Sequence, residues 1–81
     1  MSEHHPAKFS SEAGQAIRSM PQHVREQLRS ALEKAEADPC SWPQADRYDA
    51  DPTVRVVATA DAIVHYAVLP GRLWVFAALE L

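Results

Sequence analysis

The sequence predicts a single α+β domain over residues 1–81, with a two-helix hairpin packed on one face of a three- to four-stranded antiparallel sheet. Apolar residues recur at helical spacing over residues 11–37. β-Branched residues dominate from Thr53 onward, where residues 60–61 and 70–71 supply turn signals. Because short connections require antiparallel neighbours, the expected order of elements is β-α-α-β-β-β.

The first half of the chain predicts a short strand and two helices. Residues 4–9 fit an edge strand, because their proline cannot donate to a sheet ladder. Ser10 can cap a helix that runs to about Ser19. Pro21 opens a second helix, which Asp38-Pro39 ends. The apolar stripes are Ala13, Ala16, Ile17 and Met20 in the first helix, and Val24, Leu28, Ala31, Leu32 and Ala35 in the second.

The second half predicts a long loop and three strands. Residues 39–52 contain three prolines and several aspartates, which are typical of a loop. The loop is long for a connection in a small domain, and Trp42 and Tyr48 are expected to pin it to the body. The expected strands are Thr53–Ala58, Asp61–Leu69 and Arg72–Leu81.

Composition narrows the class of protein. The chain has 81 residues, 47% hydrophobic and 23% charged, with a net charge of −3, as in a soluble globular domain. It lacks an uncharged apolar run long enough to cross a bilayer, and its first residues lack the apolar core of a secretory signal. We therefore expect a cytoplasmic protein that does not enter a membrane, with residues 1–7 flexible.

The distribution of charge disfavours a broad phosphate-binding face. Acidic residues exceed basic residues in the 39–52 loop, whereas the helices carry equal numbers of each over residues 11–37. Arg25 and Arg29 lie four positions apart on one helix, where like charges repel.

No metal or cofactor site is expected from the sequence. His4 and His5 are adjacent and point apart in a strand, and His23 with Glu26 supplies only two ligands. The single cysteine, Cys40, has no clear histidine partner and is expected to be a bystander thiol. The chain also has no glycine-rich phosphate loop.

The predicted sheet is apolar on both faces. We assign to the helix-covered face Val54, Val56, Val64, Tyr66, Val68, Leu73, Val75, Ala77 and Leu79. The other face then presents Arg55, Val57, Ile63, His65, Ala67, Leu69, Trp74, Phe76, Ala78 and Glu80. Two helices cover one face only, and a water-facing sheet normally alternates with polar residues. The second face therefore predicts a partner-binding surface at Val57, Ile63, Leu69, Trp74 and Phe76, unless the N-terminal segment or the 39–52 loop covers it.

Two stretches resemble the RelE/ParE superfamily of bacterial toxin–antitoxin modules. The stretch MPQHVREQLRSALEKAEADP resembles the long second helix of that family, which ends in Asp-Pro. The stretch TVRVVATADAIVHYAVLPGRLWVFAAL resembles its arginine-bearing strand, tyrosine-ended strand, turn and apolar strand. The resemblance spans roughly residues 8–79 and implies the same β-α-α-β-β-β order.

The family residues transfer only in part. Arg55 matches the arginine of the first strand in this region, and Tyr66 matches the tyrosine that closes the next strand. Ile63 stands where the family commonly has a second arginine, and the chain stops at Leu81 where many members continue with a histidine or arginine. The sequence thus departs from the family pattern where the RNA-cleaving branch has its activity.

RNA cleavage would need a base, cations beside the phosphate and an acid for the leaving oxygen. The candidate catalytic residues are Arg55, His65 and Arg72. Strand alternation puts His65 and Tyr66 on opposite faces, so they cannot easily act together. The alternative to a catalytic role for His65 is a structural one, as a partly covered sheet residue. Arg55 can equally be a functional cation or a solvated sheet residue.

These residues leave two hypotheses for function. In the first, the chain is a RelE/ParE-like toxin that inhibits translation or gyrase by binding and is neutralised by an antitoxin laid on the second sheet face. Its enzymatic version would be a ribosome-dependent endoribonuclease that cuts mRNA, which the departures from the family pattern disfavour. In the second, it is a non-toxic homodimeric interaction module that pairs through the same face.

Overall fold

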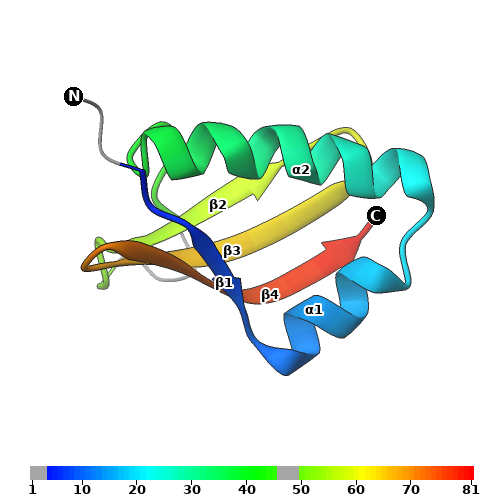
Figure 1. Ribbon diagram of the computed structural model, residues 1–81, viewed down its shortest axis with the longest axis horizontal. Helices are drawn as coiled ribbons and strands as arrows, with labels where there is room; N and C mark the ends of the chain where they lie inside the picture. Colours follow the sequence, from blue (N-terminus) through cyan, green and yellow to red (C-terminus); the bar gives the residue numbers. More distant parts are fainter. Residues whose placement is uncertain (1–3, 46–49) are drawn as a thin grey trace.

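The computed structural model describes residues 4–45 and 50–81 and confirms the predicted α+β fold (Figure 1). The elements follow the predicted order and begin or end within three residues of the predicted positions. They are β1 (Ala7–Phe9), α1 (Ser11–Arg18), α2 (Gln22–Ala37), β2 (Val54–Ala58), β3 (Ala62–Leu69) and β4 (Arg72–Glu80). Within the described ranges, neither helix has the length and apolar character needed to span a bilayer.

The sheet is mixed, with the strand order β1-β4-β3-β2. Strands β2, β3 and β4 pair antiparallel as predicted, because the connections between them are short. Strand β1 instead runs parallel to β4, with Ala7 opposite Leu73 and Phe9 opposite Val75. A parallel pair needs a long crossover, and the two helices and two strands that separate β1 from β4 in the chain provide it.

Local sequence signals begin and end the helices. The Ser10 hydroxyl accepts a hydrogen bond from the Ala13 N–H at 3.1 Å, which confirms the predicted cap of α1. Helix α2 follows Pro21 and ends at Asp38, whose extended backbone (φ −146°, ψ 93°) is the conformation that a following proline favours.

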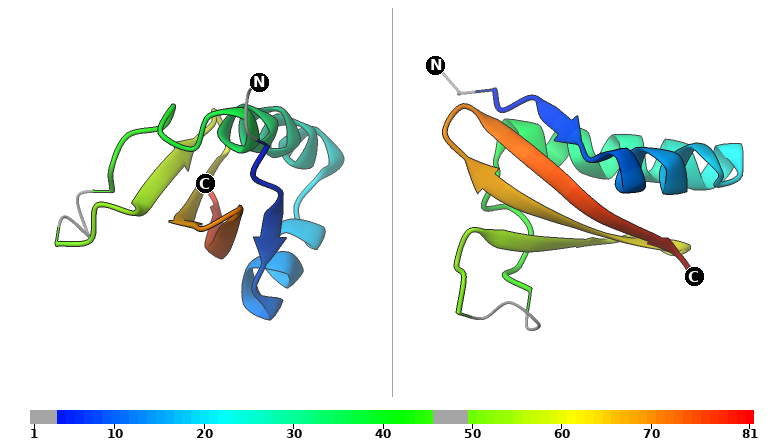
Figure 2. Two further views of the ribbon diagram at one scale, coloured as in Figure 1. Left: turned by 60° about the vertical axis from the view of Figure 1, so that its left-hand side comes forward. Right: turned by 90° about the horizontal axis from the view of Figure 1, so that it is seen from below.

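The core lies between the sheet and the two helices, which occupy the same side of the sheet (Figure 2). Helix α1 packs beside β4, and α2 buries the predicted stripe except for Ala31, which is half-buried. The buried core residues are Ala13, Met20, Val24, Leu28, Leu32, Ala35, Val57, Ala62, Val64, Tyr66, Leu73 and Val75.

The facing predicted for β2 is wrong. Val57 pairs with Val64 and is 0% exposed in the core, whereas Val56 pairs with His65 on the side away from the helices. Arg55 pairs with Tyr66 and therefore also lies on the helix side. Because β2 is apolar at nearly every position, its sequence alternation could not decide which set of side chains would be buried.

A bulge in β4 also reverses part of the predicted facing. His65 pairs with Ala77 and Tyr66 with Val75, so Phe76 is an extra residue in β4. Beyond it, Ala78 packs against the core, whereas Ala77 and Leu79 take positions on the outer side opposite His65 and Ile63. The predicted assignments of Ala77 and Leu79 to the helix face, and of Ala78 and Glu80 to the outer face, are therefore wrong.

The C-terminal half of α2 contacts chain segments that precede and follow the helix. The His5 N–H donates to the Glu36 carbonyl at 2.9 Å, and the Ala7 N–H donates to the Glu36 carboxylate at 2.7 Å. The prediction that residues 1–7 are flexible did not include these hydrogen bonds of His5 and Ala7. Residues 1–3 lie outside the described ranges. Trp42 is pinned as predicted, because its Nε1–H donates to the Ala31 carbonyl at 3.1 Å. Tyr48 lies outside the described residues.

Candidate functional site

The three candidate catalytic residues lie on different parts of the molecule. Arg55 is on the helix side of β2, and His65 is on the opposite side of the sheet, where β3 pairs with Val56 and Ala77. Arg72 is exposed at the start of β4, and it lies about 13 Å from His65 along the strands. The described structure therefore does not bring the three side chains together around one reacting group.

Arg55 holds the segment that follows α2. Its Nη1 donates to the Trp42 carbonyl at 3.1 Å, and its Nη2 lies 3.9 Å from the Cys40 sulfur. Its buried Nε has no acceptor among the described residues. These contacts direct the guanidinium into the protein, so its placement is that of a structural cation.

Tyr66 secures the same segment from β3. Its hydroxyl donates to the Pro39 carbonyl at 2.6 Å, and the side chain is fully buried. Burial raises the pKa of Tyr66 to about 12, although the nearby Arg55 charge acts in the opposite direction. The hydroxyl thus stays protonated at neutral pH, where it serves as a hydrogen-bond donor and not as a general base.

The predicted partner-binding surface is present in part. We define the outer face as the side of β3 and β4 away from the helices, formed by Ile63, His65, Ala67, Leu69, Trp74, Phe76, Ala77 and Leu79. His65 and Phe76 lie together here, with ring centroids 6.3 Å apart. Trp74 and Leu79 are 38% and 62% exposed, whereas Ile63, Leu69 and Phe76 are half-buried. Val57, predicted as a member, lies in the core instead.

The loop after α2 protects the edge of β2. Gln44 forms an isolated antiparallel bridge with Arg55, the Ala45 N–H donates to the Val54 carbonyl at 3.1 Å, and both Ala45 and Val54 are buried. The sequence left open a 39–52 loop that covers the second sheet face. The part of the loop that the structure describes does so at β2 only. Trp74 and Leu79 on β4 remain accessible.

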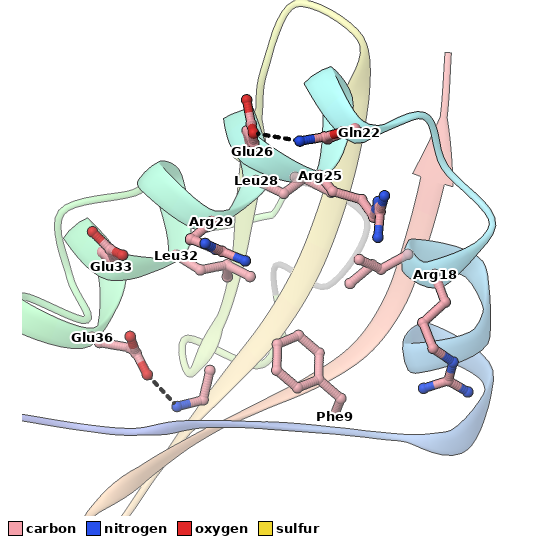
Figure 3. A pocket seen from close by; sticks show the side chains of 12 residues that line it. Phe9, Arg18, Gln22, Arg25, Glu26, Leu28, Arg29, Leu32, Glu33 and Glu36 are labelled. Atoms are coloured by element: carbon pink, nitrogen blue, oxygen red, sulfur yellow. Dashed lines mark hydrogen bonds between the residues drawn. The ribbon is translucent and has the colours of Figure 1, made fainter.

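The structure also contains a groove that the sequence did not predict. A groove of about 700 Å³ lies between β1 and α2, and we call it the α2 groove (Figure 3). Its lining is apolar at Ala7, Phe9, Ile17, Leu28 and Leu32, and polar at Arg18, Gln22, Arg25, Glu26, Arg29, Glu33 and Glu36.

The α2 groove carries charges of both signs. Glu26 and Glu33 lie in its lining with Arg25 and Arg29, and the Glu26 carboxylate accepts a hydrogen bond from the Gln22 side chain at 3.1 Å. Arg18 and Arg25 lie toward its open end, whereas Glu36 closes the other end by accepting the Ala7 N–H (Figure 3). In the described ranges, Arg18, Arg25 and Arg29 form no hydrogen bond or ion pair with another side chain. The one sequence signal for this site was the repulsive spacing of Arg25 and Arg29, which puts two like charges on one helix face.

Comparison with known proteins adds no family assignment. No family model matches the chain, and a search of curated proteins returns no match. Within residues 4–45 and 50–81, no group of three or more His, Cys, Asp or Glu side chains is placed to hold a metal ion. The features of the chain that bear on its function are therefore the outer face, the α2 groove and the sequence resemblance.

Proposed function

We propose that the chain is a RelE/ParE-like toxin component that acts by binding a macromolecular target in translation or DNA supercoiling and is neutralised by an antitoxin. The observation that carries this proposal is the apolar outer face, on which Trp74 and Leu79 are accessible and the helices give no cover. The β-α-α-β-β-β order, which the resemblance implied, supports it.

The same geometry favours binding over RNA cleavage. The Arg55 and Tyr66 side chains hold backbone carbonyls of Trp42 and Pro39, and His65 is on the other face of the sheet. A cleavage site would need its base, acid and cations within hydrogen-bond reach of one phosphate.

Growth after induced expression tests the proposal. We expect the wild-type chain to arrest bacterial growth while mRNA at ribosomes stays intact, and co-expression of the product of an adjoining small reading frame to restore growth. Trp74→Glu should keep the arrest but lose the rescue, because a charge replaces the apolar anchor for the antitoxin. Ser30→Glu, which introduces the same charge at an exposed position of α2 on the other side of the sheet, should be rescued like the wild type. Cleaved mRNA would instead support the endoribonuclease, and normal growth would refute the toxin proposal.

The second candidate is a non-toxic homodimer that pairs through the outer face. A two-fold dimer would bury Trp74 and Leu79 of both copies in one sheet-on-sheet interface. Sedimentation velocity over a range of concentrations tests it, with Trp74→Glu expected to give a monomer. Phe9→Glu is the matched control, because Phe9 is similarly exposed (43% against 38%) but lies on the helix side. A wild-type chain that stays monomeric would exclude this candidate.

A further inference from the structure

The free edge of β1 faces the α2 groove. The Pro6 carbonyl accepts from the Leu73 N–H at 3.0 Å, and the Ser10 N–H donates to the Val75 carbonyl at 2.9 Å. Hydrogen-bonding groups of alternate residues in a strand point to opposite edges, so the groups of His5, Ala7 and Phe9 point away from β4. The first two donate to Glu36 as described above, and the Phe9 N–H, next in this series, has no acceptor in the described ranges.

The shape of the groove leaves room beside this edge. Strand β1 and helix α2 meet at Glu36 and diverge from there, and the Phe9 ring lies between them with Leu28 and Leu32 on the helix opposite (Figure 3). Exposed main-chain groups on an edge strand are a template for another strand, and apolar side chains beside them add area to bury. Edge and apolar lining together favour an extended peptide as the occupant.

The arginines indicate the charge of that peptide. Arg25 and Arg29 are separated by about 6 Å along α2, since four residues rise 1.5 Å each. Alternate side chains of a strand are about 6.6 Å apart and point to the same side. Two acidic side chains spaced two positions apart would therefore meet the two guanidinium groups, which have no carboxylate partner among residues 4–45 and 50–81.

We propose that the α2 groove binds an extended acidic segment of a partner protein, which pairs with Phe9, the last residue of β1, and continues along the groove toward its open end. The Glu36 carboxylate already takes the place of a strand carbonyl at Ala7, so the segment begins beyond it. This binding site is separate from the outer face and does not depend on the toxin proposal.

Peptide selection tests the proposal directly. A displayed library of random seven-residue peptides is selected on the wild-type chain, and the enriched peptides are measured against variants by isothermal titration calorimetry. We expect enrichment of acidic residues spaced two positions apart, and binding at least tenfold weaker in the double variant Arg25→Glu, Arg29→Glu. Arg72→Glu, one substitution of the same kind outside the groove, should bind like the wild type. A lack of enriched peptides, or peptides that bind the double variant equally well, would overturn the proposal.

Amide resonances give a readout that does not depend on a variant. When a selected peptide is added to the ¹⁵N-labelled wild-type chain, the Phe9 amide should move downfield and exchange with solvent more slowly, because it gains an acceptor. The Lys8 amide, whose position in the strand faces β4, should change little. Shifts confined to Trp74 and Leu79 on the outer face would refute the groove as the binding site, whatever the outcome of the growth experiment.

Discussion

At the scale of single residues, Tyr66 and Arg55 show how positions matched to a toxin family are used here for structure. Both side chains donate to carbonyls of the segment that follows α2, at Pro39 and Trp42. A buried donor and acceptor that lose each other leave an unsatisfied polar group, which costs about 1–3 kcal/mol. We therefore expect these residues to contribute to the free energy of unfolding.

Replacing Tyr66 with phenylalanine should lower the free energy of unfolding by about 1–3 kcal/mol at pH 7, since the Pro39 carbonyl loses its donor. The deficit should shrink as the pH rises. The tyrosine pKa is about 10 in the unfolded chain and about 12 in the fold, so the wild type loses stability between these values while the variant has no such group to ionise. Urea unfolding of both proteins at pH 7, 10 and 11.5 measures this, and a deficit that stays constant with pH would contradict the raised pKa.

At the scale of the elements, β2 is the strand whose orientation matters most for the functional argument. Its pairing with β3 buries Val57 beside Val64 and turns Val56 away from the helices. This removes Val57 from the predicted partner surface and leaves the outer face centred on β3 and β4. The bulge at Phe76 enlarges that face, since Phe76 and Ala77 both lie opposite His65.

Paired truncations in β2 test this orientation. Val57→Ala should lower the free energy of unfolding by about 2–3 kcal/mol, because two methyl groups leave a closed core. Val56→Ala, the same change one position earlier, should cost about 1 kcal/mol, since Val56 is only half-buried. Chemical denaturation measures both values, and a larger cost for Val56 would show that β2 faces the other way.

At the scale of the whole molecule, one core on one side of the sheet supports the entire fold. Helix α2 supplies Leu28 at 1% exposed, while Leu79 on the outer face is 62% exposed. A chain of 81 residues buries a modest share of its surface, so losing one core side chain removes a large part of its stability.

Leu28→Ala should lower the free energy of unfolding by about 2–5 kcal/mol, whereas Leu79→Ala should change it by less than about 0.5 kcal/mol. Far-ultraviolet circular dichroism reports the unfolding of the helices. The fluorescence of Trp42, whose indole N–H donates to the Ala31 carbonyl of α2, reports the unfolding of the loop. A Trp74→Phe background leaves Trp42 as the one tryptophan. Both signals should change at the same urea concentration in each protein. Separate transitions would show that the helices and the loop after α2 do not unfold together.

The sequence by itself determined the order and extent of the elements. The Ser10 cap, the Asp38-Pro39 stop and the apolar stripe of α2 act within a few residues of one another, so they can be recognised without a fold. The alternation of β3, and of β4 up to its bulge, likewise predicted that Ile63, Leu69, Trp74 and Phe76 would share the face away from the helices.

The tertiary structure decided the facing of β2, the bulge at Phe76, the parallel pairing of β1 and the α2 groove. Each depends on which residues of different elements lie opposite one another, such as Val57 and Val64 or Phe9 and Val75. A shift of one residue in such a pairing exchanges the two faces of a strand, and an apolar strand fits either way. The separation of Arg55, His65 and Arg72 has the same origin, because the register and facing of β2, β3 and β4 decide where each side chain points.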